Sequence, residues 1–134
     1  MSEENVELVR RSVEAFWRGD IDAFLEEVGD DVEVDFSRAR GPYRGVYRGR
    51  EGARELFAAF WDVFSSIRPL STEYIDVGDK VVLAASVRFR GRGSGVDVGG
   101  GGMGAVLTLR DGKIVHYQLF QSKAEAIEAA GPRE

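Results

Sequence analysis

Two successive pairs of strand-like runs occupy most of the second half of the chain. Residues 71–93 alternate apolar and polar side chains on both sides of a Gly78-Asp79 turn, and residues 96–121 do so around Asp111-Gly112. Asp-Gly between two alternating runs is a strong signal of a β-hairpin. Because short turns join consecutive strands in antiparallel pairs, these residues predict four antiparallel strands.

The first half carries helical patterns instead. Apolar side chains recur at helical spacing after Ser2, a typical N-cap residue, and we expect this helix to end at Gly19. Asp20 is suited to cap a short second helix that ends at Gly29. A third helix with a broad aromatic face is expected from about residue 50 to residue 66.

One strand and one further helix complete the pattern. Residues 31–36 (DVEVDF) alternate apolar and acidic side chains and predict a strand. Near the end of the chain, Ser122 and Glu125 form a capping box, and Gly131-Pro132 is a typical helix stop. Since helices precede a run of antiparallel strands, the order favours an α+β fold over a parallel doubly wound sheet.

Composition narrows the class of protein. The 134 residues carry a net charge of −5, an apolar content of 43% and no cysteine. We therefore expect one domain, residues 1–134, without disulfides or a cysteine-type zinc site. The acidic balance argues against general nucleic-acid binding. The N-terminus is unlike a signal peptide and no run approaches the roughly 18 apolar residues of a membrane span, so we expect a cytoplasmic protein that binds no membrane.

Four consecutive glycines, residues 99–102, stand out within the last predicted pair of strands. A phosphate-binding loop would need a helix after it, but Met103 to Leu107 continues a strand. We expect the glycines to bend a strand so that the sheet curls around a cavity. The alternative is a hairpin end without a role.

Three segments, ENVELVRRSVEAFWRGDIDAFLEEVGDDVEVDF, YRGREGARELFAAF and LRDGKIVHYQLFQSKAEAIEAAG, resemble the SnoaL-like polyketide cyclases and ketosteroid isomerases. These families belong to the nuclear-transport-factor-2-like superfamily. The resemblance implies a cone-shaped α+β barrel, with three N-terminal helices packed on a strongly curved, mostly antiparallel sheet. It also implies an apolar pocket, no cofactor and a homodimer formed through the outer sheet face.

The resemblance also locates the family's catalytic positions. The carboxylate base of ketosteroid isomerases falls on Phe36, with Asp35 one residue earlier and on the opposite face of the strand. The family's helix-one tyrosine falls on Ser12, and its strand aspartate falls near Ala105. Steroid-type isomerisation is therefore not expected unless a bulge turns Asp35 inward.

The expected pocket is apolar, with Ser12, Tyr117 and Gln121 as its polar groups. On the last strand, the resemblance places Val115, Tyr117, Leu119 and Gln121 inward and Ile114, His116, Gln118 and Phe120 outward. Ala85, Val87 and Phe89 also face inward, which leaves Arg88 and Arg90 outside. The expected ligand-binding residues are Ser12, Phe16, Phe36, Leu56, Phe60, Val87, Phe89, Met103 and Leu119.

His116 is the only histidine. With no cysteine and no second histidine to join it, we expect no metal site. A catalytic pair with Asp35 is one interpretation, and a surface or dimer-interface side chain is the other. Asp35 is either a general base or a solvated carboxylate paired with an arginine. Tyr117 and Gln121 are candidates to donate hydrogen bonds to a ligand carbonyl, or Tyr117 is a core residue.

Residues 38–54 contain six arginines interleaved with tyrosines. Such a segment suits an anionic ligand, and the alternative is a solvated loop whose positive charge offsets the negative charge of the protein.

Two functions stay open. One is a cofactor-free isomerase, cyclase or lyase that transfers protons on an apolar substrate through Asp35, Tyr117, Gln121 or His116. The other is a non-catalytic module that binds a hydrophobic or amphipathic metabolite or serves as a dimerising interaction domain.

Overall fold

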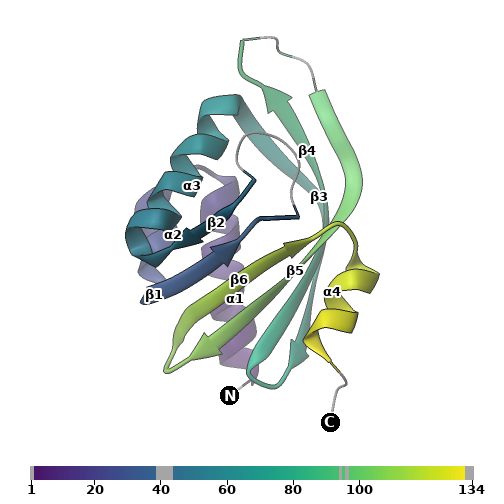
Figure 1. Cartoon of the computed structure of the whole chain (residues 1–134). Helices are drawn as coiled ribbons and strands as arrows, with labels where there is room; N and C mark the ends of the chain where they lie inside the picture. Colours follow the sequence, from purple (N-terminus) through teal and green to yellow (C-terminus); the bar gives the residue numbers. More distant parts are fainter. Residues whose placement is uncertain (1, 39–43, 94, 96, 132–134) are drawn as a thin grey trace.

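The computed structural model describes residues 2–38, 44–93, 95 and 97–131. Helices and strands combine in one α+β fold, in which three helices lie on one side of a curved sheet and a short fourth helix lies on the other (Figure 1). The elements in chain order are α1 (Ser2–Trp17), α2 (Ile21–Glu26), β1 (Val28–Asp35), β2 (Val46–Arg48), α3 (Gly49–Val63), β3 (Phe64–Val77), β4 (Lys80–Gly91), β5 (Asp97–Arg110), β6 (Lys113–Phe120) and α4 (Lys123–Ala130).

The six strands form one sheet in the order β2-β1-β6-β5-β4-β3. The neighbouring pairs are antiparallel except β1 and β6, which run parallel. The expected mostly antiparallel sheet and both hairpins are therefore confirmed. The sheet is open, with β2 and β3 at its edges, so the fold resembles a cone without closing into a barrel.

Two predicted helix ends are wrong. The second helix ends at Glu26, and Gly29 lies inside β1, because the chain joins the sheet where the Ile114 amide donates to the Glu27 carbonyl at 2.9 Å. The third helix ends at Val63, not Ser66. Phe64 has extended backbone angles and starts β3. One carbonyl in the last turn of α3 accepts a hydrogen bond from outside the helix, since the Arg92 guanidinium donates to the Trp61 carbonyl at 2.8 Å.

The arginine-rich segment contains a strand that the sequence pattern did not predict. β2 is only three residues long, and it pairs with the end of β1, where Tyr47 lies opposite Val34. Three residues are too few to show an alternating pattern. The strand leads directly into α3 at Gly49, so it fixes the start of that helix beside the sheet.

A hydrophobic core fills the space between the sheet and α1, α2 and α3. Its centre is a set of aromatic rings from all three helices, with centroids 5.2 Å apart for Phe16 and Phe24 and 5.3 Å apart for Phe16 and Phe57. We call the sheet surface that contributes to this core the inner face. The opposite surface is the outer face, where α4 covers a smaller apolar cluster of Val82, Val106 and Phe120.

The run of glycines lies within β5, as expected for a bent strand. Gly102 pairs with Ser86 and Gly99 pairs with Arg88, so β5 has one residue more than β4 over this stretch, which is a β-bulge. Gly99 has a φ of +96°, and a Cβ on it would come within 2.8 Å of the Val87 carbonyl oxygen. The bulge therefore depends on glycine at this position.

The end of the chain forms the predicted small helix. The Ser122 side chain accepts from the Glu125 amide at 3.2 Å, while the Glu125 carboxylate accepts from the Gln121 amide at 2.9 Å. Gly131 follows the helix with a φ of +87°, and Pro132 lies outside the described residues. None of the described helices is both long enough and apolar enough to cross a membrane.

Candidate functional site

The strand registers align a row of side chains across the inner face. Leu119 on β6, Ala105 on β5, Leu83 on β4 and Tyr74 on β3 are successive partners across four strands. Tyr117, two residues before Leu119, shares its face of β6. This row is the part of the sheet that faces α1 and the main core.

All nine predicted ligand-binding residues are buried in the interior or packed against the main core, four on helices α1 and α3 and five on the sheet side. Six of them are buried, namely Ser12, Phe16, Phe36, Leu56, Phe60 and Val87. The other three are partly buried and pack against the same cluster, namely Phe89, Met103 and Leu119. The Ser12 hydroxyl donates to the Phe24 carbonyl at 3.4 Å, so it already has a partner within the helical layer.

Tyr117 lies in the core with its ring 5.6 Å from the ring of Phe36. Burial raises the pKa of its hydroxyl well above the ordinary value of a tyrosine, and the nearby Tyr74 phenol raises it further. Tyr117 is therefore a neutral phenol at physiological pH, and a neutral phenol can donate a hydrogen bond.

Tyr74 is a residue that the sequence interpretation missed. Its hydroxyl is buried and finds no hydrogen-bond partner among the described residues. The Arg10 guanidinium lies 4.7 Å from the ring centroid, and burial, with a smaller contribution from Glu14, raises the pKa of Tyr74 to about 12. The hairpin pattern could have revealed that Tyr74 faces inward. The Gly78-Asp79 turn sets Tyr74 of β3 opposite Leu83 of β4, and Leu83 shares the face of the residues expected inward on β4.

Two side chains, one on β6 and one directly after it, depart from the expected alternation of inward and outward positions. Gln121 was expected inward, but it is exposed and its amide donates to the Arg38 carbonyl, because β6 ends at Phe120. Ile114 was expected outward, but it is fully buried in the main core. A bulge at Val115 explains this, since Ile114 and His116 pair with the adjacent residues Leu109 and Thr108.

Asp35 does not lie on the face that carries Tyr117. It is paired in register with Gln118, on the outer face of the sheet, and its side chain is half-buried. Its Oδ1 accepts from the amide and hydroxyl of Ser37 at 2.9 and 2.6 Å. Burial would raise the pKa of Asp35, but these two hydrogen bonds, helped by His116 and Arg38, hold it below its usual value. Asp35 is thus a stable carboxylate.

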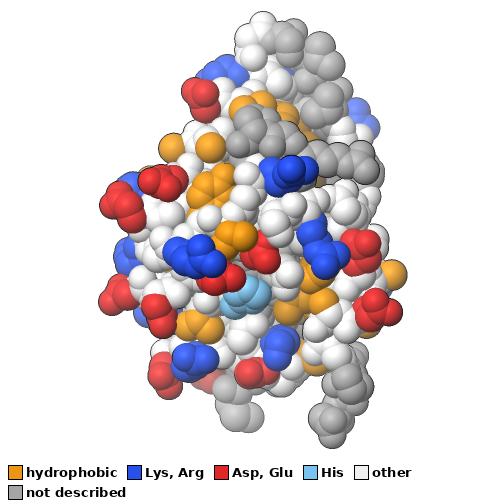
Figure 2. Space-filling view, in the orientation of Figure 1, with side chains coloured by type: hydrophobic (Ala, Val, Ile, Leu, Met, Phe, Trp, Pro, Cys, Tyr) orange, Lys and Arg blue, Asp and Glu red, His pale blue; other side chains and the backbone are white. Residues whose placement is uncertain are grey.

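His116 is half-buried beside two carboxylates on the outer face. Its Nε2 lies 3.6 Å from Oε2 of Glu33, its register partner on β1. One ligand atom from each of Glu33, Asp35 and His116 lies within 4.8 Å of the others. Figure 2 shows the single histidine on this face among acidic and basic side chains.

Several arginines of residues 38–54 are used within the protein. Arg50 donates to the carbonyls of Leu25 and Val28 at 2.6 and 3.0 Å, which ties the end of α2 to α3. The Arg38 guanidinium lies 5.2 Å from the Phe120 ring, and Arg48 lies 3.5 Å from Glu33. Arg40 lies outside the described residues.

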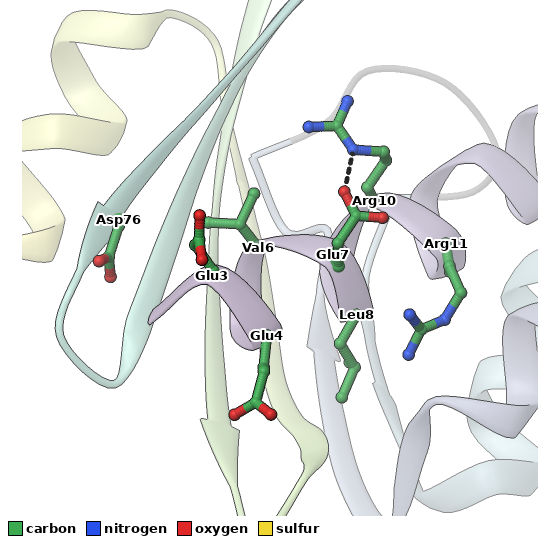
Figure 3. A pocket seen from close by; sticks show the side chains of 8 residues that line it. All are labelled: Glu3, Glu4, Val6, Glu7, Leu8, Arg10, Arg11 and Asp76. Atoms are coloured by element: carbon green, nitrogen blue, oxygen red, sulfur yellow. Dashed lines mark hydrogen bonds and ion pairs between the residues drawn. The ribbon is translucent and has the colours of Figure 1, made fainter. Parts of the chain in front are cut away.

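Two grooves run along α1 on the side of β3. The larger, of about 800 Å³, has mostly charged walls (Figure 3), formed by Glu3, Glu4, Val6, Glu7, Leu8, Arg10, Arg11 and Asp76. The smaller, of about 430 Å³, is lined by Glu14, Trp17, Arg18, Ile67, Pro69, Leu70, Ser71 and Thr72. Neither groove includes a residue of the predicted site.

The chain belongs to the SnoaL-like domain family, whose model matches residues 9–117. This confirms the resemblance drawn from the sequence. A comparison with curated proteins found no match.

Solved structures with the same fold cover almost the whole chain. TerC, crystallised with polyporic acid, is 23% identical with a TM-score of 0.76, over 96% of this chain and 99% of TerC. A nuclear-transport-factor-2-like protein from Burkholderia xenovorans is 20% identical with a TM-score of 0.78, over 98% of each chain. A polyketide-cyclase-like protein from Xanthomonas campestris is 24% identical with a TM-score of 0.76, over 97% of this chain and 98% of its own. At these identities the likeness establishes the fold.

Proposed function

We propose that the protein binds a small, mainly apolar molecule that carries a hydrogen-bond acceptor, on the inner face of the sheet. The observation that carries this proposal is the buried Tyr74 hydroxyl, which has no partner among the described residues. A buried hydroxyl without a partner costs stability, and such a cost is typical of a group kept for a ligand. The second donor is Tyr117, a buried phenol on the same face of the sheet as Tyr74.

Apolar side chains supply the contact area for such a ligand. Phe89, Met103 and Leu119 are only partly buried although they adjoin the main core. Two aromatic rings, Phe36 and Phe60, lie in the same cluster. Burial of apolar surface against these side chains would provide most of the binding free energy, and the phenols would fix the position of the ligand's oxygen.

The inner face favours binding over proton transfer. Apart from tyrosines, Ser12 is the one buried polar side chain among the described residues. The phenols suit stabilisation of a developing oxyanion, but a proton-transfer enzyme would also need a base on the same face. Asp35 and His116 both lie on the outer face. The isomerase, cyclase or lyase therefore ranks second, and it would need a base from the ligand or from elsewhere.

The test is a titration of the isotope-labelled protein followed by NMR. Polyporic acid, the molecule crystallised with TerC, is the first probe, followed by a panel of apolar aromatic carbonyl compounds. We expect saturable shifts at Phe89, Met103 and Leu119. Leu119→Asp should abolish these shifts, whereas the control Leu70→Asp, at a side chain that is 50% exposed on β3, should preserve them. Shifts confined to α1 or to the outer face across the whole panel would contradict the proposal.

A further inference from the structure

The outer face of β1 and β6 brings three metal-ligating side chains together. Glu33 pairs with His116 and Asp35 pairs with Gln118 in the parallel register. Because alternate residues of a strand share one face, these four side chains project from the sheet on the same side. The three candidate ligand atoms lie within 4.8 Å of one another. The sequence suggested His116 and Asp35 as a pair but no metal site, because Glu33 joins them only through the parallel register of β1 and β6.

Neighbouring groups orient the two carboxylates. Oε1 of Glu33 lies 3.5 Å from Nε of Arg48, which leaves Oε2 directed to His116. Oδ1 of Asp35 is held by Ser37, and Oδ2 lies 3.5 Å from the Gln118 amide. In metal sites, such second partners fix one oxygen of a carboxylate while the other binds the ion. Oε2 of Glu33 therefore faces the ring Nε2 of His116. Oδ2 of Asp35 has only the long Gln118 hydrogen bond, which it must give up to bind an ion.

We propose that Glu33, Asp35 and His116 bind a divalent transition-metal ion of the zinc type on the outer face. An imidazole nitrogen with two carboxylate oxygens is a donor set that Zn²⁺ accepts, whereas Mg²⁺ and Ca²⁺ prefer oxygen alone. Water completes the coordination, because Gln118 turns its amide nitrogen, which is a donor, toward Asp35. Ligand atoms about 2.1 Å from a tetrahedral zinc ion lie about 3.5 Å from one another. The three ligand atoms must therefore approach one another by roughly 1 Å, through rotation of their side chains.

The surroundings allow that rotation. The side chains of Glu33 and His116 are 39% and 34% exposed, so they can rotate without displacing the core. The Arg48 side chain is 74% exposed and can turn its guanidinium to solvent when the ion arrives. This site lies on the face opposite Tyr117, so it is independent of the proposed ligand site.

The test uses the untagged full chain and Zn²⁺ alone as the probe. Calorimetric titration is expected to give one zinc per chain, and NMR of the single imidazole should show Nε2 shifting on saturation. His116→Gln, Glu33→Gln and Asp35→Asn should each lower the zinc affinity at least tenfold. Glu128→Gln, on α4, removes an equal charge outside the three-residue cluster and should leave the affinity unchanged. An excess of Mg²⁺ should not displace the zinc.

Apo unfolding curves of each variant establish that it is folded before its zinc affinity is compared. The proposal fails if wild-type protein shows no saturable binding below about 1 mM Zn²⁺. It also fails if His116→Gln binds zinc as tightly as wild type, or if the imidazole signals do not move. Each of these three results would leave the inner-face ligand proposal unaffected, because that proposal is tested with other probes and other residues.

Discussion

Tyr74 shows at the scale of one residue how function and stability can oppose each other. Its hydroxyl is buried with no partner among the described residues, while its ring packs on the core and under Arg10. Replacement by phenylalanine keeps the ring and removes the unpaired oxygen. We expect Tyr74→Phe to raise the free energy of unfolding by about 1 kcal/mol, because a buried unpaired hydroxyl costs that much or more.

Urea unfolding measures this change, and the NMR titration of the same variant measures ligand binding. The affinity for an acceptor-bearing ligand should fall about fivefold to tenfold, as expected for one lost hydrogen bond. A variant that is less stable than wild type would show that the hydroxyl has a partner in solution. Unchanged ligand affinity would remove Tyr74 from the proposed site.

Asp35 makes a pH-dependent contribution to stability. Its folded pKa is lowered, despite burial, by the two hydrogen bonds from Ser37. The stabilising contribution is therefore fully present above the unfolded-state pKa of about 3.9 and is lost as the pH falls through the lower, folded-state value. We expect Asp35→Asn to be less stable than wild type at pH 7.

The measurement is the free energy of unfolding of both proteins between pH 3 and pH 7. The gap between wild type and Asp35→Asn should narrow as the pH falls below about 4, where the unfolded carboxyl is protonated. A gap that stays constant over the whole range would mean that ionisation of Asp35 does not contribute to folding.

At the scale of elements, the contact of α4 with β5 depends on glycine, which has no side chain, at position 104 of β5. A Cβ on Gly104 would overlap the Ser122 carbonyl oxygen and lie 2.9 Å from the Cβ of Ala126. The helix therefore packs directly on the strand backbone and covers the outer-face cluster around Val106. This explains why glycine continues beyond the bulge in β5.

We expect Gly104→Ala to lower the free energy of unfolding by about 1–3 kcal/mol, because α4 must move away from the strand. Gly102→Ala is the matched control on the same strand, since its Cβ would meet only the Ala85 carbonyl oxygen at 4.0 Å. Urea unfolding of both variants checks this. Equal losses in the two variants would contradict the packing explanation and point to strand propensity instead.

At the scale of the whole molecule, the sequence predicted the layers better than the site. Hairpin turns and helical spacing predicted the α+β order, because these signals are local. β2 is too short to show a period, and the bulge at Val115 moved Ile114 inward against the alternation. The grouping of Glu33 and Asp35 with His116 arises from parallel pairing of β1 with β6. No local pattern encodes which distant strand becomes a neighbour, so the sequence suggested Asp35 with His116 as one interpretation but did not add Glu33 to them.

The main core predicts how the molecule unfolds. One cluster contains side chains from α1, α2, α3 and the strands β1, β3, β4, β5 and β6, and the Trp61 indole donates to the Phe16 carbonyl at 3.0 Å. Elements that share one core should unfold together. We therefore expect one urea transition with the same midpoint by tryptophan fluorescence, which reports α1 and α3, and by circular dichroism, which also reports the sheet.

Phe24→Ala tests that cooperativity directly. Phe24 is fully buried and its ring contacts Phe16 and Phe57, so the variant should lose about 3–5 kcal/mol of unfolding free energy. Because the core is shared, both signals should move to the same lower midpoint, with the slope against urea unchanged. If fluorescence moved while circular dichroism stayed in place, the helical layer would unfold separately from the sheet, and residues 1–134 would not behave as one domain.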